Sequence, residues 1–134
     1  MLRLLDTRFA IFRLPPGEQP PYLAGLRGEL VMVTRTADEV TVICPEPELP
    51  AQVQAEHGWR ALKVEAPFEL ASAVGVLTAL TDPIAAAGIA IFAISTWATD
   101  YILVRHDRFR EAIAALRQAG YAVNARELRP PDHN

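Results

Sequence analysis

The chain has 134 residues, of which 51% are hydrophobic and 22% are charged, a balance typical of a soluble globular protein with one domain or two very small ones. The formal net charge of −3 and the scattered basic residues exclude the clustered positive surface that binds nucleic acid. Because Cys44 is the only cysteine, an internal disulfide and a CxxC-type metal site are also excluded.

The first ten residues, MLRLLDTRFA, interrupt their apolar positions with Asp6 and two arginines. They lack the apolar core of a signal peptide, and no run in the chain approaches the length of a membrane span. We therefore expect a cytoplasmic protein with no membrane partner and no nucleic-acid partner.

The next segment, LPPGEQPPYLAGLRG, has four prolines, which leave room for one short turn of helix around Tyr22–Leu26. Two β-rich runs follow, Leu30–Val33 and Val40–Ile43, on either side of a polar crossing. This pattern predicts a hairpin of two short strands.

A helix is predicted after this hairpin. Leu49 and Val53 are four residues apart, and Pro50 suits a first helical turn. Gly58 suits the end of the helix, and the run Trp59–Glu65 then predicts a strand.

The segment SAVGVLTALTDPIAAAG predicts another helix, with Ser72 as its N-terminal cap and Gly88 as its end. Pro83 lies inside the pattern, so we expect a kink or a restart near Asp82. The apolar positions on one side of this helix are Val74, Leu77, Leu80 and Ile84.

The remaining elements are a hairpin, a helix and a strand. Ile89–Ile94 and Tyr101–Val104 are β-rich, and the helix begins at Asp107 as a cap and ends at Gly120. A strand over Tyr121–Glu127 follows. The residues that keep the period of one buried helix face are Phe109, Ala112, Ile113 and Leu116.

The second half of the chain repeats the first half at an offset of 62 residues (34 to 96). The matched pairs are Thr34 with Thr96, Asp38 with Asp100, Gly58 with Gly120, and Trp59 with Tyr121. Hydrophobic pattern and end signals recur together, which predicts two copies of one structural unit.

The second copy has the order strand, helix, strand, strand, helix, strand, which is the ferredoxin-like βαββαβ pattern of the α+β class, with an antiparallel sheet. We predict an abbreviated unit over residues 1–58, a full unit over 59–128 and a loose tail over 129–134. Only the strand 59–65 separates the two helical regions, so it is shared or exchanged. We expect 121–127 to return to the first sheet, which would interlock the units.

The run GIAIFAISTWATDYILV, followed by a helix and AGYAV, resembles ACT domains, the small regulatory modules of aspartate kinase, chorismate mutase and prephenate dehydrogenase. With the shortened upstream copy, which contains VTRTADEVTVICPE, the chain is similar to stand-alone tandem ACT proteins of bacteria and to the ACT halves of cytosolic arginine sensors. The resemblance covers nearly the whole chain.

The resemblance implies that a free amino acid binds at an interface between ACT units. The ligand would lie between the loop that opens the first helix and the second strand pair. Asp100 matches the acidic hairpin residue of the arginine sensors, but no acid stands just before Gly75, which departs from their pattern. The implied ligand-binding residues are Glu69, Ser72, Ala73, Val74, Gly75, Ser95, Thr96, Trp97 and Asp100.

These residue types suit an amino acid. The ligand's carboxylate requires backbone N–H groups such as a helix start offers, and Gly75 allows a close approach. The ammonium requires a carboxylate and hydroxyls, which Asp100, Ser95 and Thr96 carry. Trp97 suits the wall of the side-chain pocket or a stack on a cation.

Each of these residues also has a structural interpretation. Asp100 and Thr96 are both residue types that satisfy backbone groups at a turn. Trp97 suits packing, and Gly75 suits a close contact between elements. The sequence alone leaves these alternatives open.

Other chemistry is not indicated. The three histidines have no ligand spacing, so no metal or cofactor is expected. Cys44 suits a small buried position, and Glu46 and Glu48, separated by Pro47, suit a solvated loop. No nucleophile is paired with a base, so we do not expect an enzyme.

Two functions follow from these observations. The first is a regulatory module that senses a free amino acid, forms a homodimer and regulates an enzyme partner that the sequence does not identify. The alternative is an interaction or oligomerisation scaffold that binds no ligand and associates through its sheet edges.

Overall fold

The structure, a computed structural model, describes residues 1–65 and 76–125. The chain divides into two compact units. We call Thr7–Trp59 the small unit, and Met1–Asp6 together with the chain from Arg60 onward the large unit. None of the described helices is long and apolar enough to cross a membrane.

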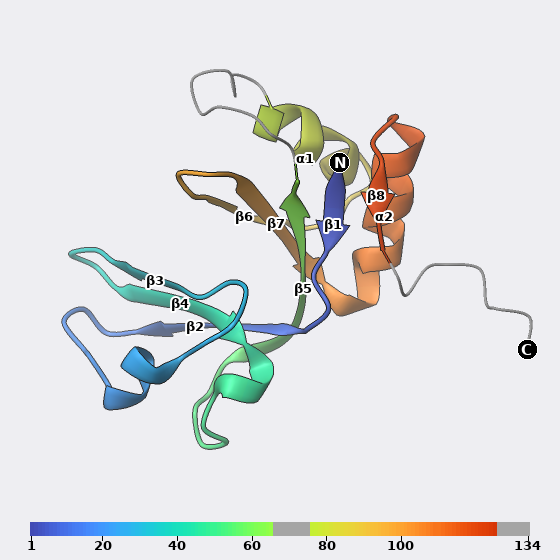
Figure 1. Ribbon diagram of the computed structural model, residues 1–134. Coiled ribbons are helices and arrows are strands. Elements are labelled where there is room, and N and C mark those ends of the chain that lie inside the picture. The colour runs from blue at the N-terminus through green and yellow to red at the C-terminus, as the bar shows by residue number, and fades with distance from the viewer. Residues whose placement is uncertain (66–75, 126–134) are drawn as a thin grey trace, which may run out of the picture. The chain divides into compact units, whose positions relative to one another are not determined.

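The sheet of the small unit is antiparallel (Figure 1). Its strands, in the order in which they lie, are β3 (Met32–Arg35), β4 (Val40–Pro45), β2 (Phe9–Leu14) and the start of β5 (Glu56–Val64). The first strand of this unit, β2, therefore lies between β4 and β5, as in the split βαβ arrangement.

The core of the small unit follows from the period of a strand. Val40, Val42 and Cys44 alternate along β4, so they lie on one face of the sheet, and all three are buried. Phe12 of β2 is opposite Val42 and joins them. The residues that pack against this cluster are Leu14, Tyr22, Leu23, Leu26, Val31, Leu49, Val53 and Ala55.

Two 3-10 helices in the small unit stand where the βαββαβ pattern has α-helices. They are η1 (Pro21–Gly25) and η2 (Glu46–Glu48). The short turn predicted around Tyr22–Leu26 is confirmed as η1. Both 3-10 helices have a proline within their first two residues, where its missing N–H leaves no bond unmade.

The helix predicted between Leu49 and Gly58 is wrong. The short η2 ends at Glu48, before this stretch, and β5 already begins at Glu56. Gly58, with φ of +80°, lies where β5 carries one extra residue opposite β2, so it marks a bulge in a strand.

Glu46 and Glu48 were expected to lie in a solvated loop, and Glu48 is indeed exposed, but both carboxylates also form hydrogen bonds. Glu46 accepts a hydrogen bond from the backbone N–H of Gly58 at 2.6 Å, and its Oε2 lies 3.3 Å from Nδ1 of His57. Glu48 accepts from the backbone N–H of Arg27 at 2.9 Å. Both carboxylates therefore satisfy backbone donors.

The large unit contains both described α-helices and the remaining strands (Figure 1). β7 (Asp100–Arg105) pairs with β6 (Phe92–Ser95) and with β5. β1 (Leu2–Leu4) is antiparallel to β5 and parallel to β8 (Val123–Asn124). The α+β class with mainly antiparallel strands is confirmed.

The expectation that the last strand returns to the first sheet is wrong for its described residues. Val123 pairs with Leu2 and Asn124 with Arg3, so β8 lies beside β1 in the large unit. The N-terminal strand is thus inserted between β5 and β8. A bond of 2.5 Å from Arg3 Nε to Glu65 Oε1 fixes β1 to the end of β5.

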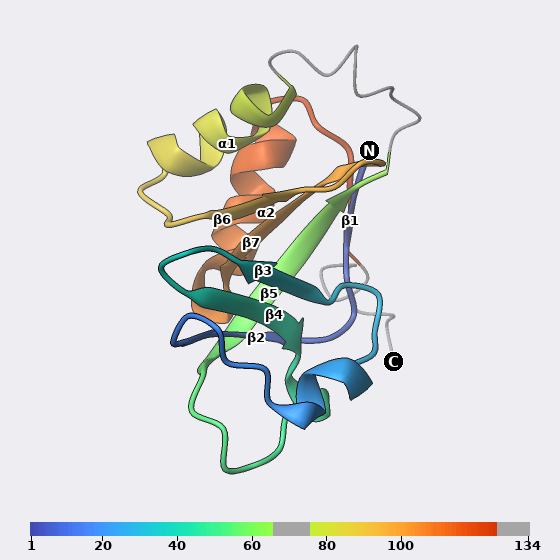
Figure 2. The ribbon, with the colours of Figure 1, turned by 90° about the vertical axis from the view of Figure 1, so that its left-hand side faces the viewer.

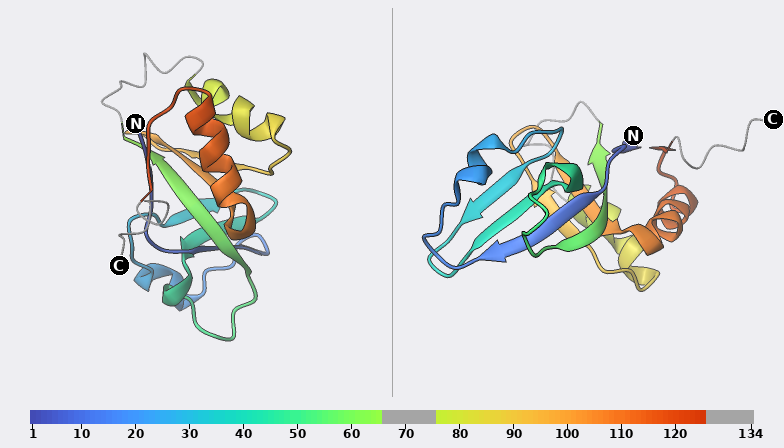
Figure 3. Two further views of the ribbon diagram at one scale, coloured as in Figure 1. Left: turned by 90° about the vertical axis from the view of Figure 1, so that its right-hand side faces the viewer. Right: turned by 90° about the horizontal axis from the view of Figure 1, so that it is seen from below.

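Both α-helices, α1 (Val76–Ala86) and α2 (Phe109–Gln118), lie on the same face of the large unit's sheet (Figures 2 and 3). The predicted buried face of α2 is confirmed, because Phe109, Ala112, Ile113 and Leu116 are all buried. The other residues of this core are Leu2, Leu4, Leu62, Val64, Leu80, Ile84, Ile89, Ile102, Val104, Val123 and Ala125.

The helix ends agree only in part with the sequence. Gly120 and Gly88 both follow a helix with positive φ, as predicted. Asp107 does not cap α2, because it lies in the 3-10 helix η4 (His106–Arg108), and Arg108 at the cap position makes no side-chain capping bond. The helix α1 passes through Pro83 without a restart.

The two β-hairpins are related by an offset of 60 residues, so the offset of 62 is wrong for this part of the chain. Strand β3 pairs with β4 through Met32 and Ile43, and β6 pairs with β7 through Phe92 and Leu103. The residue numbers of the second pair exceed those of the first by 60 in both strands. Thr96 therefore corresponds to Thr36. The predicted correspondences of Thr34 with Thr96 and of Asp38 with Asp100 are wrong.

Candidate functional site

Four of the predicted ligand-binding residues lie at the tip of the β6–β7 hairpin. Ser95 ends β6 and is directly opposite Asp100, which begins β7. Thr96 and Trp97 lie in the turn between them. The other five lie outside the described residues: Glu69, Ser72, Ala73, Val74 and Gly75.

The hydroxyl of Thr96 closes this turn. It donates to the carbonyl of Thr99 at 2.9 Å and accepts from the backbone N–H of Thr99 at 3.2 Å. Thr36 makes the same two bonds with Glu39, at 3.2 and 3.1 Å. The repeated threonine therefore has a structural role, and ligand contact by Thr96 stays a prediction.

Thr99 was not among the predicted site residues, but it fixes the hairpin tip in place. Its side chain is buried, and its hydroxyl donates to the carbonyl of Val64 at 2.5 Å. Val64 is the last residue of β5, so the bond connects the tip to the end of that strand. No local sequence pattern predicts this contact, because the two residues are far apart in the chain.

Asp100 is the chemically notable residue of the tip. Its side chain belongs to a residue that is only 6% exposed, yet none of the hydrogen bonds and ion pairs among the described residues engages its carboxylate. A cation bound beside it would form a charge-assisted hydrogen bond with this carboxylate. The arrangement therefore suits a positively charged group of a ligand.

Trp97 lies at the tip of the turn, where it is 87% exposed. A role as the wall of a ligand pocket stays a prediction.

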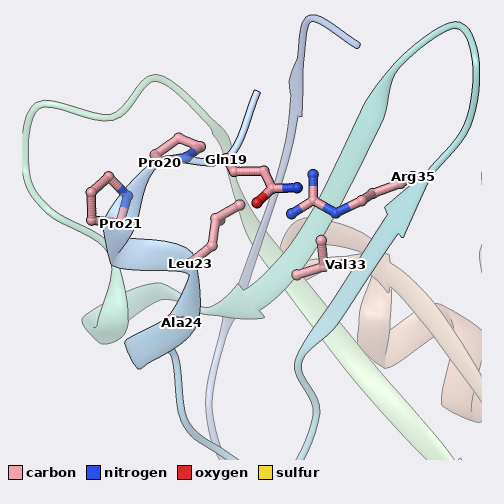
Figure 4. A pocket seen from close by; sticks show the side chains of 7 residues that line it. All are labelled: Gln19, Pro20, Pro21, Leu23, Ala24, Val33 and Arg35. Carbon is pink, nitrogen blue, oxygen red and sulfur yellow. The ribbon is translucent and has the colours of Figure 1, made fainter. Parts of the chain in front are cut away.

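The small unit contains a surface pocket of about 400 Å³ between η1 and β3 (Figure 4). Arg35, at the end of β3, donates from Nη1 to the carbonyl of Glu18 at 3.0 Å. Arg35 is the counterpart of Ser95 in the other hairpin. The lining residues are Gln19, Pro20, Pro21, Leu23, Ala24, Val33 and Arg35. Sequence reasoning missed this pocket, because it took the proline-rich segment only as a shortened helix.

Cys44 has no catalytic chemistry in this setting. Burial of the thiol, with a smaller effect from the charge of Glu48, raises its pKa to about 11. The thiol is therefore protonated and unreactive at neutral pH. The described part of the chain also holds no group of three or more side chains that could bind a metal ion.

Comparison with known proteins gives a family match. A family model for the ACT domain matches residues 54–118. A solved structure of a protein from Agobacterium tumefaciens is 31% identical, with a TM-score of 0.84 over 92% of this chain and 91% of that chain. No curated protein matches this chain with significance.

More distant solved structures share the fold. A protein of unknown function from Vibrio cholerae, described as a possible transport protein, is 19% identical with a TM-score of 0.70, over 90% of this chain and 89% of that one. The ligand-free regulatory subunit of aspartate kinase from Thermus thermophilus is 18% identical with a TM-score of 0.61, over 90% of this chain and 97% of that one.

Proposed function

This chain belongs to the ACT-domain family, and from that premise we propose that it is a regulatory module that binds a free amino acid. The fold supports this proposal, because the same arrangement forms the regulatory subunit of aspartate kinase from Thermus thermophilus. The module acts on an enzyme partner whose identity is open, and it has no catalytic role of its own.

The observation that carries the proposal is the position of Asp100 at the hairpin tip, where the residue is only 6% exposed and its carboxylate has no hydrogen bond or ion pair among the described residues. The ammonium of an amino acid supplies the charge that this carboxylate lacks among the described residues. Ser95 is directly opposite and offers a hydroxyl. The ligand's carboxylate would meet the backbone N–H groups of the Ser72–Gly75 segment, as expected from the resemblance.

Such a site would bind with modest affinity. Hydrogen bonds to charged groups contribute about 1.5–3 kcal/mol each. Two or three of them support a binding free energy of about −4 to −8 kcal/mol, which corresponds to roughly millimolar to micromolar dissociation constants. This range suits the sensing of a metabolite pool.

The tandem, dimeric arrangement is part of the same proposal. The common register of the two hairpins supports two ACT-type units, with β5 beginning in the small unit and ending in the large one. Among the described strands, β3 and β6 each pair with a single neighbour, so each offers an open edge. Open edges favour association of two copies into a homodimer.

One observation favours the alternative function, a scaffold without ligand. Trp97 is exposed on the same hairpin as the β6 edge, and an exposed tryptophan is a frequent anchor of protein interfaces. A scaffold would associate through this hairpin whether or not a small molecule is present.

A thermal-shift screen of the full chain against the twenty amino acids separates the two functions. We expect one of them to raise the melting temperature, because a ligand at one hundred times its dissociation constant stabilises by about 2.7 kcal/mol. The shift should vanish in Asp100→Asn and persist in Asp38→Asn, which removes an exposed acid from the other hairpin. No shift with any amino acid, together with association that persists in Asp100→Asn, would establish the scaffold.

A further inference from the structure

We propose that the pocket of the small unit is a second ligand site, which binds a small carboxylate with an apolar body and no ammonium group. The pocket lies between η1 and β3, and all of its lining residues belong to the small unit. It is therefore separate from the Asp100 site, and the proposal does not depend on the amino-acid function.

The charge of the lining selects an anion. Arg35 is the one charged residue among the seven that line the pocket. Its bond to the carbonyl of Glu18 holds the guanidinium in place and uses one of its five N–H groups. The side-chain amide of Gln19 points toward the guanidinium of Arg35 (Figure 4), so a carboxylate bound beside them can accept hydrogen bonds from both side chains.

The rest of the lining selects an apolar body. Leu23, Val33 and two prolines supply apolar surface, and Val33 is 38% exposed in the empty pocket. A volume of about 400 Å³ is near the lower end of the range for small-molecule sites, about 300–1,000 Å³. A branched or aromatic acid of few heavy atoms fits this description.

The pocket is also formed in advance. Pro20 and Pro21 fix their own backbone angles, and Leu23 packs on the core of the small unit. A binding site that needs no ordering on association loses less of its interaction free energy.

The absence of an acid from the lining separates this ligand from an amino acid. An ammonium group would lose its water with no carboxylate in the lining to replace it. A 2-oxo acid carries the same carboxylate and side chain without that cost. The two sites thus carry charges of opposite sign, from Asp100 in the large unit and from Arg35 in the small unit.

Nuclear magnetic resonance titration of the full chain tests this proposal, with 4-methyl-2-oxopentanoate as probe and leucine and 3-methylbutan-1-ol as comparators. We expect the oxo acid to shift the backbone amides of Leu23, Ala24 and Val33, and to bind at least about tenfold more tightly than either comparator. Equal binding of leucine or of the alcohol would overturn the charge argument, and shifts confined to other residues would overturn the site.

Two variants and two controls complete the test. Arg35→Gln should weaken binding of the oxo acid at least about tenfold, and Val33→Asp, which adds a negative charge to the lining, should abolish it. Arg27→Gln makes the same charge change in the same unit outside the pocket and should leave binding intact. Asp100→Asn should also leave it intact, so failure here and failure of the amino-acid proposal are distinguishable. Unchanged affinity in Arg35→Gln would refute the proposal.

Discussion

At the scale of a single side chain, the proposed amino-acid site depends on Asp100. The residue is only 6% exposed, and no hydrogen bond among the described residues engages its carboxylate, whereas Thr96 and Thr99 satisfy the groups of the turn. A residue that serves folding should be stabilised by its surroundings. A residue kept for a ligand is instead a cost to the empty protein.

The first prediction follows from this cost. Asp100→Asn removes a buried charge at constant shape, so the free energy of unfolding of the ligand-free protein should stay the same or rise by about 1 kcal/mol. Urea denaturation followed by fluorescence measures it. The exposed Asp38→Asn is the matched control and should lie within about 0.5 kcal/mol of the parent. Loss of more than about 1 kcal/mol in Asp100→Asn would assign Asp100 to the turn.

Gly28 gives the second prediction at the residue scale. Its φ is +144°, and a Cβ atom there would lie 2.5 Å from Cγ of the buried Pro45 ring. Gly28→Ala should therefore lower the free energy of unfolding by about 2–4 kcal/mol.

Gly25 is the matched control for Gly28. It lies in η1, and a Cβ atom there meets nothing within 4 Å. Gly25→Ala should change stability by less than about 1 kcal/mol, in the stabilising direction. Equal effects of the two substitutions in urea denaturation would contradict the contact with Pro45.

At the scale of elements, the hairpin turns are the repeated feature. Thr36 and Thr96 each place one hydroxyl against the carbonyl and the N–H of the residue three positions on. This arrangement closes a hairpin without the glycine that tight turns usually use.

Replacing Thr96 tests this arrangement. Thr96→Ala should lower the free energy of unfolding by about 1 kcal/mol, because it leaves the backbone N–H of Thr99 without its partner and removes one of the two hydrogen bonds to the carbonyl of Thr99. Thr96→Ser retains the hydroxyl and should recover most of the loss. If serine and alanine are equally destabilising in thermal unfolding, the methyl group is responsible instead of the hydroxyl.

The contact between β1 and the end of β5 predicts a pH dependence of the protein's stability. The hydrogen bond from Arg3 lowers the pKa of Glu65 below the ordinary value of 4.5, helped by the positive charges of Arg3, Lys63 and the amino terminus. The stability that this carboxylate contributes is present above pH 4.5 and is lost as the pH falls through the lowered value. Arg3→Gln should therefore flatten the fall in stability at acid pH. An unchanged pH profile of urea denaturation would contradict the role of this bond.

The elements that the sequence predicts are those with local causes. The helix α2 is such a case, because Phe109, Ala112, Ile113 and Leu116 keep a helical period that no other structure explains. The helix predicted after Leu49 does not form, because η2 ends at Glu48 and β5 begins at Glu56, which leaves only seven residues (49–55) between them.

What the sequence could not predict depends on contacts between distant residues. The pairing of β1 with β8 and the bond from Thr99 to Val64 both join segments far apart in the chain. The offset of 62 was misleading because it was chosen from identical residues, whereas the correspondence of the two hairpins depends on the register of their strands. Hairpin tip residues could be named from sequence, but their separate roles needed the hydrogen bonds.

At the scale of the whole molecule, two units with related hairpins carry different chemistry. The large unit presents an acid at its hairpin, and the small unit presents Arg35 at the corresponding hairpin, beside a pocket. A chain of this kind suits a regulator that reads more than one metabolite. The sign of the charge at each site, rather than the fold, would then decide which ligand binds.

A crystal structure of the full chain grown with the amino acid that gives the largest thermal shift is the most direct test of the central claim. We expect the ligand's ammonium nitrogen within about 3.2 Å of a carboxylate oxygen of Asp100, with the ligand beside the β6–β7 hairpin. An amino acid bound elsewhere, with Asp100 left unengaged, would contradict the claim.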